Sequence, residues 1–397
     1  MSVTAFVLLA AVCAADRATQ FEVRVYDGEP VRGSFETMGA GGTLTFADGK
    51  AISGGDWYCM RRTPGVLPPW PREPHVELTN GDRIRGVIAS ADGDALRLAV
   101  AWPGVPDQIL QFPFSSVRVT WLRSGPPDAE PAWLAGPRKR DVILSRNGDL
   151  TLGALMAIDV SKSQVRFQAD GKDRELPLSK VSAVAFNTDL ARVRRPKGPY
   201  YRLVLTDGTR LSVTALTFDQ RLWTAQTLFK ESIKIPPDRI VAIDVEQGKA
   251  AYLSDVKPEK YEYQSFDGEN RSWVADRNAI GQAMRLKTPE GESTFDRGVG
   301  LHAECRITYP LGGKFRRFES LVGLDAESGV RGDAILEITV DGKSIELPAR
   351  GRLTQSGGAI ALKVDVAGAK QLTIAVGPGN GGIVHDIVNL AVARLIP

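Results

Sequence analysis

The sequence is poor in cysteine and histidine and has no long hydrophobic run. Only three residues of each of these two types occur among 397. So few cysteines exclude the disulfide framework typical of small secreted domains. So few histidines leave little material for a metal cluster, which commonly takes three or four ligands. No apolar stretch reaches the ~20 residues that cross a bilayer as a helix, so we expect no transmembrane anchor.

The chain is also short of aromatic residues, at 7%, and of net charge, at +3. A charge this small gives no argument for nucleic acid or an anionic membrane as a partner. The hydrophobic fraction of 43% is that of an ordinary globular protein. A length of 397 residues exceeds what one core commonly supports, which predicts two or more domains.

The N-terminus carries an apolar run from Val3 to Ala15. It ends in small residues before Asp16, and its length predicts a cleaved signal peptide over residues 1–15. No Lys or Arg precedes the run, and a buried first strand is the alternative. The signal peptide implies a secreted protein, or one of the periplasm or cell envelope. After cleavage only Cys59 and Cys305 would remain, and we expect two separate buried thiols.

A pattern of strand, Asp-Gly or Asn-Gly turn and strand recurs four times in the first two thirds of the chain. These dipeptides mark tight hairpins because both turn positions favour positive φ. The turn glycines are Gly28, Gly81, Gly148 and Gly208. A second glycine follows five residues later in the first three copies, at Gly33, Gly86 and Gly153, and Val213 takes its place in the fourth. The pattern predicts β-repeats over 20–62, 75–123, 140–187 and 200–247.

The rhythm of these repeats resembles that of Sm-like or SH3-like small barrels. We expect them to serve as a scaffold, with protein partners as a further role. The linkers between them are rich in proline, glycine or charge, and two contain the basic runs Arg138–Arg140 and Arg192–Lys197. These runs are interpreted as solvated charge or as a contact with an acidic polysaccharide. Many Sm-like barrels bind RNA, but the signal peptide argues against a nucleic acid partner.

The last third alternates apolar and polar residues at the two-residue period of strands with one buried face, as in Leu336, Ile338 and Val340. Within it the phrases Gly300-Leu301-His302-Ala303, Leu311-Gly312-Gly313-Lys314-Phe315, Val322-Gly323-Leu324-Asp325 and Val340-Asp341-Gly342 follow one another. Together they resemble the NPCBM family, carbohydrate-binding modules associated with family 98 glycoside hydrolases. The resemblance covers residues 251–397. The expected fold class is therefore all-β, with several small β-barrel-like repeat units followed by a C-terminal jelly-roll-like β-sandwich.

Sugar sites on β-sandwiches pair an aromatic face with charge-assisted hydrogen bonds to hydroxyl groups. Trp273 is the one tryptophan of the C-terminal module, and it is either a sugar platform or a core aromatic residue. His302 is either a structural histidine or a ligand contact. The candidate carbohydrate-binding residues are Trp273, Arg271, Asp276, Arg277, Asn278, His302, His385, Asp386 and Asn389. Leu390 stands where many members of the resembling family have tryptophan, so either a sugar contact or only core packing differs there.

We expect a non-catalytic protein that binds a glycan or cell-envelope polysaccharide. No nucleophile-elbow pattern is present, and carboxylates such as Asp27, Asp82 and Asp149 are explained by their turns. One alternative is a structural or protein-interaction protein whose sandwich no longer binds sugar. Another is a glycoside hydrolase whose carboxylates the sequence does not locate. No cofactor is expected, and no motif identifies a structural Ca²⁺ among the sandwich loops.

Overall fold

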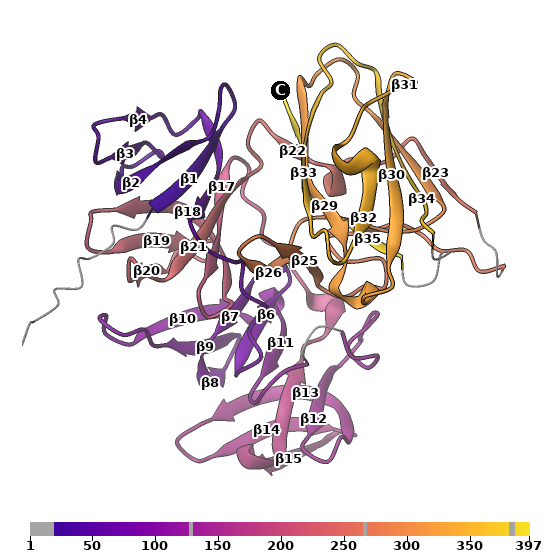
Figure 1. Ribbon diagram of the computed structural model, residues 1–397. Helices are drawn as coiled ribbons and strands as arrows, with labels where there is room; N and C mark the ends of the chain where they lie inside the picture. Colours follow the sequence, from indigo (N-terminus) through magenta and orange to yellow (C-terminus); the bar gives the residue numbers. More distant parts are fainter. Residues whose placement is uncertain (1–19, 127–129, 265–267, 381–385) are drawn as a thin grey trace, which may run out of the picture.

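The structure is a computed structural model that describes residues 20–126, 130–264, 268–380 and 386–397 (Figure 1). The helices in these ranges are six 3₁₀ turns of three or four residues, and the rest of the regular structure is β-strand. This confirms the all-β fold class. The expected signal peptide at 1–15 lies outside the described residues. Within them, no helix has the length and apolarity needed to traverse a bilayer.

The first twenty-one strands form four successive units. Unit 1 consists of β1 (Gln20–Val25), β2 (Val31–Met38), β3 (Leu44–Phe46), β4 (Ala51–Ile52) and β5 (Trp57–Arg62). Unit 2 consists of β6 (His75–Leu78), β7 (Arg83–Arg85), β8 (Val87–Asp92), β9 (Ala95–Val100), β10 (Gln108–Pro113), η1 (Phe114–Ser116) and β11 (Val117–Trp121). Unit 3 consists of β12 (Asp141–Ser145), β13 (Leu150–Asp159), β14 (Gln164–Ala169), β15 (Lys172–Pro177), η2 (Leu178–Lys180) and β16 (Val181–Ala185), followed by η3 (Thr188–Leu190). Unit 4 consists of β17 (Tyr200–Leu205), β18 (Arg210–Phe218), β19 (Trp223–Thr227), β20 (Ser232–Ile235) and β21 (Ile240–Glu246).

Each unit pairs its last strand with its first and its first with its second, and the middle strands continue as antiparallel hairpins. The four predicted turn glycines have φ between +84° and +103°, the left-handed region that glycine enters without steric cost. The second glycine has a different reason. A Cβ on Gly86 would lie 2.6 Å from the Ala99 carbonyl oxygen, and one on Gly153 would lie 2.4 Å from that of Gln168. Glycine therefore lets the second strand cross closely over its neighbour.

The four units are joined in a nested order. The last strand of unit 1, β5, pairs antiparallel with the last strand of unit 4, β21, while β11 of unit 2 pairs with β16 of unit 3. Both contacts join the last strands of two units. Units 1 and 4 therefore form an outer pair and units 2 and 3 an inner pair, in the order of the sequence. Figure 1 places units 1 and 4 side by side and unit 3 at the far end of the molecule.

The C-terminal strands form a separate two-layer sandwich and one additional two-stranded sheet, β25–β26. They are β22 (Ala251–Tyr252), β23 (Lys260–Tyr263), β24 (Val274–Ala275), β25 (Met284–Thr288), β26 (Gly291–Phe295), β27 (Gly298–His302), β28 (Cys305–Pro310), β29 (Arg317–Leu324), β30 (Asp333–Val340), β31 (Lys343–Ser344), β32 (Arg352–Thr354), β33 (Ile360–Asp365), β34 (Gln371–Pro378) and β35 (Ile387–Ile396). The short helices are η4 (Leu253–Asp255), η5 (Ala326–Ser328) and η6 (Pro348–Gly351).

Two antiparallel sheets, β24-β27-β35-β29-β33 and β23-β28-β34-β30-β31, face each other across a common core. The predicted alternation is confirmed, since Leu336, Ile338, Leu362 and Ile374 are all buried in that core. Burying one face of every strand is what holds two such sheets together. Cys59 and Cys305 are buried free thiols, as expected.

The sandwich is docked on units 1 and 4 rather than tethered loosely to them. A buried apolar cluster joins Leu67 of the first linker and Val241 of β21 to Leu286 and Phe295 of the sandwich. Beside this cluster, Arg394 donates to Asp244, which also accepts two hydrogen bonds from Arg61 at 2.7 and 2.8 Å. A continuous apolar and ionic interface therefore fixes the module against the repeats.

Candidate functional site

A cluster of polar and aromatic side chains lies at the end of β23 and β27 in the sandwich. Arg271 donates from Nη1 to the Tyr263 hydroxyl at 2.6 Å, and its guanidinium carbon lies 5.9 Å from the centre of that ring. The Tyr261 hydroxyl donates to the Arg271 carbonyl oxygen at 3.0 Å, which fixes the loop carrying the arginine. His302 presents its ring to Tyr263 edge-on, with centroids 6.4 Å apart.

His302 and Trp273 are both partly buried. Burial, together with the positive charge of Arg271, lowers the pKa of His302 from its ordinary value, so the neutral imidazole is favoured. The Trp273 side chain packs against the sandwich core while keeping part of its surface exposed. It is therefore intermediate between the platform and the core aromatic residue that the sequence suggested.

A groove adjoins this cluster on the sheet formed by β23, β28, β34 and β30. Its volume is about 750 Å³, and Tyr263 lies on its wall. Charged side chains also line it, namely Glu262, Glu304, Arg306 and Glu337. In the sheet register Arg306 is opposite Glu262 on one side and Ala375 on the other, and Ala375 is opposite Glu337. The groove thus presents a cation between two carboxylates, and Tyr263, the next residue after Glu262 on β23, borders it while packing partly against the core.

Two of the predicted residues lie inside the protein. Asn278 and Asn389 are completely buried, and each donates from its side-chain amide to Asp325, at 3.2 and 2.5 Å. Asp325 also accepts from the backbone N–H groups of Arg285 and Glu327, both at 3.0 Å. This network satisfies a buried carboxylate and joins the loop after β24 and the turn at η5 to strands β25 and β35, which is a structural task.

Asp386 and Leu390 also face inward. Asp386 is 3% exposed and accepts from the backbone N–H of Asp333 at 3.0 Å, which anchors the start of β30. Leu390 is fully buried in the core between the sheets, which favours the packing interpretation of this position. His385 lies outside the described residues, so the predicted His385–Asp386 pair has no geometry to report.

Asp276 and Arg277 lie at the opposite end of β27, against the repeat units. Asp276 is paired with Arg297, and its other oxygen accepts from the backbone N–H of Gly298 at 3.1 Å. The Arg277 guanidinium lies 4.5 Å from the ring centre of Trp70, which belongs to the linker between units 1 and 2. The eight predicted residues that the structure describes therefore do not form one site, and of these eight only Arg271, Trp273 and His302 lie near the Tyr263 groove.

The groove residues were missed because only strand pairing reveals them. Glu262, Arg306 and Glu337 come from three strands that are distant in sequence and adjacent in the sheet. Alternation predicts that each points away from the core, but it does not say which strands are neighbours. Tyr263 had a weaker signal, as an aromatic residue ending a strand before a polar loop.

No metal site is evident from the described side chains. In residues 20–126, 130–264, 268–380 and 386–397, no group of three or more His, Cys, Asp or Glu side chains is placed to hold a metal ion.

Comparison with known proteins identifies the C-terminal module. Residues 249–396 match the NPCBM/NEW2 domain family. A Renibacterium salmoninarum protein, named as an endo-alpha-N-acetylgalactosaminidase, is 30% identical over 116 residues. This match takes in 28% of the present chain and only 7% of that relative.

Two solved structures resemble parts of the chain. One is the CBM51 module of a Clostridium perfringens GH95 protein in complex with methyl-galactose, with 25% identity and a TM-score of 0.34 over 37% of this chain and 99% of the other. The second is the pair of tandem CBM51 modules of the family 98 glycoside hydrolase from Streptococcus pneumoniae SP3-BS71. It has 14% identity and a TM-score of 0.33, over 68% of this chain and 92% of the other.

Proposed function

We propose, from the NPCBM domain that residues 249–396 form, that this is a secreted, non-catalytic protein that binds a glycan through its C-terminal sandwich. The family match is the single observation that carries the proposal. The Tyr263 groove is the surface that fits it best. Units 1 to 4 would then serve as a scaffold that holds the module in a fixed orientation.

The chemistry of the groove suits a saccharide. An aromatic ring packs against the apolar face of a pyranose, and ionised side chains make strong hydrogen bonds to its hydroxyl groups. Tyr263, which borders the groove and is partly buried against the core, would have to offer one edge of its ring, while Glu304 and Arg306 supply an acceptor and a donor. Arg271 positions the tyrosine by binding its hydroxyl at 2.6 Å.

A single open groove of this kind gives weak binding, because few contacts must offset the entropy lost on association. Tight attachment to a polysaccharide would then need several copies of the protein on one chain or surface.

The test is a glycan-array screen of the full chain, followed by titration of any glycan that binds. Tyr263→Ala should weaken that binding at least tenfold, about 1.4 kcal/mol, since it removes the ring and its hydroxyl. Lys343→Gln is the matched control, because this exposed lysine belongs to the same sandwich and does not line the groove. A folded protein that binds no glycan would replace this proposal with a structural or protein-interaction role.

The absence of catalysis is part of the proposal and has its own test. Glu262, Glu304 and Glu337 line one groove, and glycoside hydrolysis needs two carboxyl groups at a defined separation. Prolonged incubation with the bound glycan should release no reducing ends. Release that Glu337→Gln abolishes would instead identify a glycoside hydrolase.

Secretion is proposed from the apolar run at Val3 to Ala15. Expression of the full chain in a bacterial host should yield a mature protein outside the cytoplasm, with a new N-terminus near Asp16. Retention of Met1 in a cytoplasmic protein would remove this part of the proposal.

A further inference from the structure

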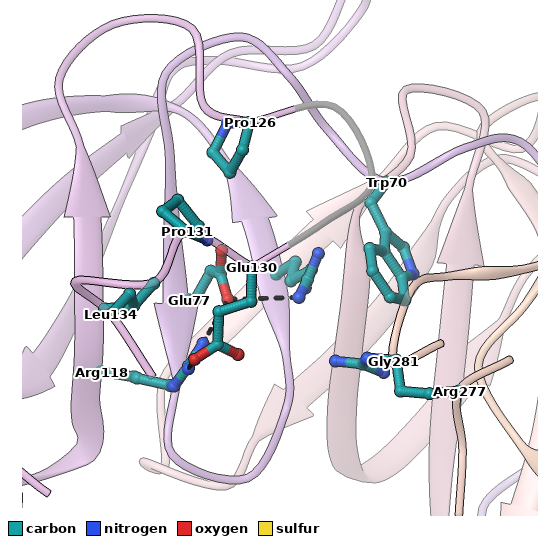
Figure 2. A pocket seen from close by; sticks show the side chains of 10 residues that line it. Trp70, Glu77, Arg118, Pro126, Glu130, Pro131, Leu134, Arg277 and Gly281 are labelled. Atoms are coloured by element: carbon teal, nitrogen blue, oxygen red, sulfur yellow. Dashed lines mark hydrogen bonds and ion pairs between the residues drawn. The ribbon is translucent and has the colours of Figure 1, made fainter. Parts of the chain in front are cut away.

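A second hollow lies where the repeats meet the sandwich, well separated in the fold from the Tyr263 groove. It has a volume of about 300 Å³ and is lined by unit 2, the linkers, unit 4 and the sandwich. Figure 2 shows the adjoining part of this hollow, with Trp70 and Arg277 on one side and Glu77, Arg118 and Glu130 on the other. We call it the interdomain pocket.

The interdomain pocket carries more positive than negative side chains. Its six arginines are Arg83, Arg118, Arg195, Arg202, Arg277 and Arg297. Its four carboxylates are Glu77, Glu130, Asp276 and Asp296. No lysine or histidine contributes to this lining, so all of its cations are planar guanidinium groups, which match oxyanions with two parallel hydrogen bonds.

The four carboxylates already have partners. Glu77 accepts from Arg118 at 3.3 Å and from the Trp121 indole at 3.1 Å, and it also pairs with Arg83 at 3.3 Å. Glu130 is paired with Arg118.

The two carboxylates that the sandwich contributes to the pocket also have arginine partners. Asp276 is paired with Arg297, and Asp296 accepts from Arg210 at 2.9 Å. The Trp70 indole donates to Asp296 as well, at 2.6 Å.

Three of the arginines have no such partner. Among the described residues, no carboxylate oxygen lies within 4.0 Å of the guanidinium nitrogens of Arg195, Arg202 or Arg277. Arg202 donates only to the Gly81 carbonyl oxygen at 3.3 Å, and its Nε is buried with no hydrogen-bond partner in the described structure. Within the part of the chain that the structure describes, Arg277 donates only to the Asp276 carbonyl oxygen, at 2.9 Å. Burial lowers the pKa of Arg277, which is therefore the least compensated of the three cations. Burial acts in the same direction on Arg202, but the carboxylates of Asp296, Asp82 and Glu246 outweigh it and raise the pKa of this arginine, while Arg195 is exposed.

The pKa of a neighbouring arginine reflects the same crowding. Burial lowers the pKa of Arg83 to about 10, and the Arg277 guanidinium adds to that effect while Glu77 opposes it. Arg83 and Arg277 both lie over the Trp70 ring, at 3.7 and 4.5 Å from its centre, which holds them in place by cation–π contact.

We propose that the interdomain pocket binds an oxyanion, either a carboxylate or a sulfate or phosphate group, between Arg202, Arg277 and Arg195. A hollow of about 300 Å³ has room for a small anion or one acidic sugar unit. The interdomain pocket is distinct from the proposed glycan groove, so anion binding and glycan binding are tested independently of each other. A bound anion would link Arg202 of unit 4 to Arg277 of the sandwich, and it would stabilise the docking of the sandwich on the repeat units.

The experiment is calorimetric titration of the full-length protein at low ionic strength with sodium sulfate, sodium phosphate, sodium glucuronate and, as the neutral match to glucuronate, glucose. Sulfate or phosphate binding alone assigns a free tetrahedral anion. Glucuronate binding alone assigns a carboxylated sugar. Either result supports the proposal, and binding should weaken as salt is added. Binding of none of the anions, or equal binding of glucose, overturns it.

Variants locate the site. Arg202→Gln and Arg277→Gln should each weaken anion binding about tenfold, the effect of losing one charge-assisted hydrogen bond. Arg195→Gln should weaken it severalfold, and since Arg195 is exposed this variant leaves the fold intact. Arg166→Gln is the control, because Arg166 is an exposed arginine of β14 that does not line the pocket. Unchanged affinity in all three pocket variants, or an equal loss in the control, contradicts the assignment.

Discussion

Trp70 and Asp296, 226 positions apart in sequence, are joined by a 2.6 Å hydrogen bond from the indole N–H to the carboxylate. The indole belongs to the linker between units 1 and 2, and the carboxylate follows β26 of the sandwich. Asp296 also accepts from the fully buried Arg210 of unit 4 at 2.9 Å. One carboxylate thus joins a linker, a repeat unit and the C-terminal module.

Replacing that carboxylate should loosen the whole junction. Asp296→Asn is expected to destabilise the protein by about 3 kcal/mol, because it leaves the buried Arg210 cation without its partner. Urea unfolding of the full chain measures the change. Glu346→Gln, an exposed carboxylate of the sandwich, should leave the midpoint unchanged. Equal midpoints for Asp296→Asn and the unmodified protein would show that the junction does not depend on this ion pair.

The lowered pKa of Asp296 predicts that the protein loses stability in acid. Burial acts to raise the pKa of Asp296, but the Arg210 and Arg202 guanidiniums outweigh it and hold the pKa below its ordinary value. A carboxyl whose pKa is lowered by folding stabilises the native state above the unfolded value of ~3.9, and this contribution is lost as the pH falls. The free energy of unfolding should therefore drop below about pH 5. Asp296→Asn should show a shallower drop over this range, and identical slopes would argue against the assignment.

The sequence predicted the strands and turns well and the site poorly. The Asp-Gly turns at Gly28 and Gly208 depend on local backbone preferences, which a short segment fully contains. The alternation at Leu336 and Ile338 likewise follows from one strand. Functional surfaces here depend instead on which strands become neighbours, as with Glu262 and Arg306, and this is decided by the complete fold.

The linkers also make contacts that a short segment of sequence does not predict. Residues 64–74 are rich in proline and were expected only to connect two repeats, yet Leu67 and Trp70 are buried against the sandwich. Asn278 stood in a polar, loop-like stretch and Asn389 in a stretch that resembles the family's terminal pattern, which suggested ligand contact, and both are partners of a buried carboxylate. Polarity in a sequence does not distinguish a residue that meets solvent from one that satisfies another polar group inside.

Substitution of two arginines in one basic run should affect the stability of the protein very differently. The interpretation of the run Arg138–Arg140 as solvated charge was wrong for Arg138, which is 8% exposed and donates to the carbonyl oxygens of Leu134 at 2.5 Å and Phe186 at 3.3 Å. Arg138→Gln should cost about 2 kcal/mol, because buried acceptors are left unsatisfied. Arg140→Gln, an exposed neighbour, should be neutral in the same urea experiment. Similar midpoints for the two variants would restore the original interpretation.

Two glycines of the sandwich provide another matched pair. A Cβ on Gly300 would lie 2.4 Å from the Arg277 carbonyl oxygen, so Gly300→Ala must displace the backbone that leads into the buried asparagine network. We expect a loss of about 2 kcal/mol or more. Gly377→Ala meets nothing closer than the Ile335 carbonyl oxygen at 4.0 Å and should be tolerated. Thermal unfolding of both variants decides this, and a stable Gly300→Ala protein would mean that the segment shifts freely.

The nested pairing of the units has a consequence for how the chain assembles during synthesis. Trp121 and Ala183 of the inner pair emerge soon after one another, and β11 can meet β16 while translation continues. Arg61 of β5 must wait for Asp244 of β21, 183 residues later, which takes about 10 to 40 s at ~5–20 residues per second. During that interval the outer edge of β5 has no partner strand and is open to pairing with another chain. The unit made first is thus the last of the four to be closed into the sheet.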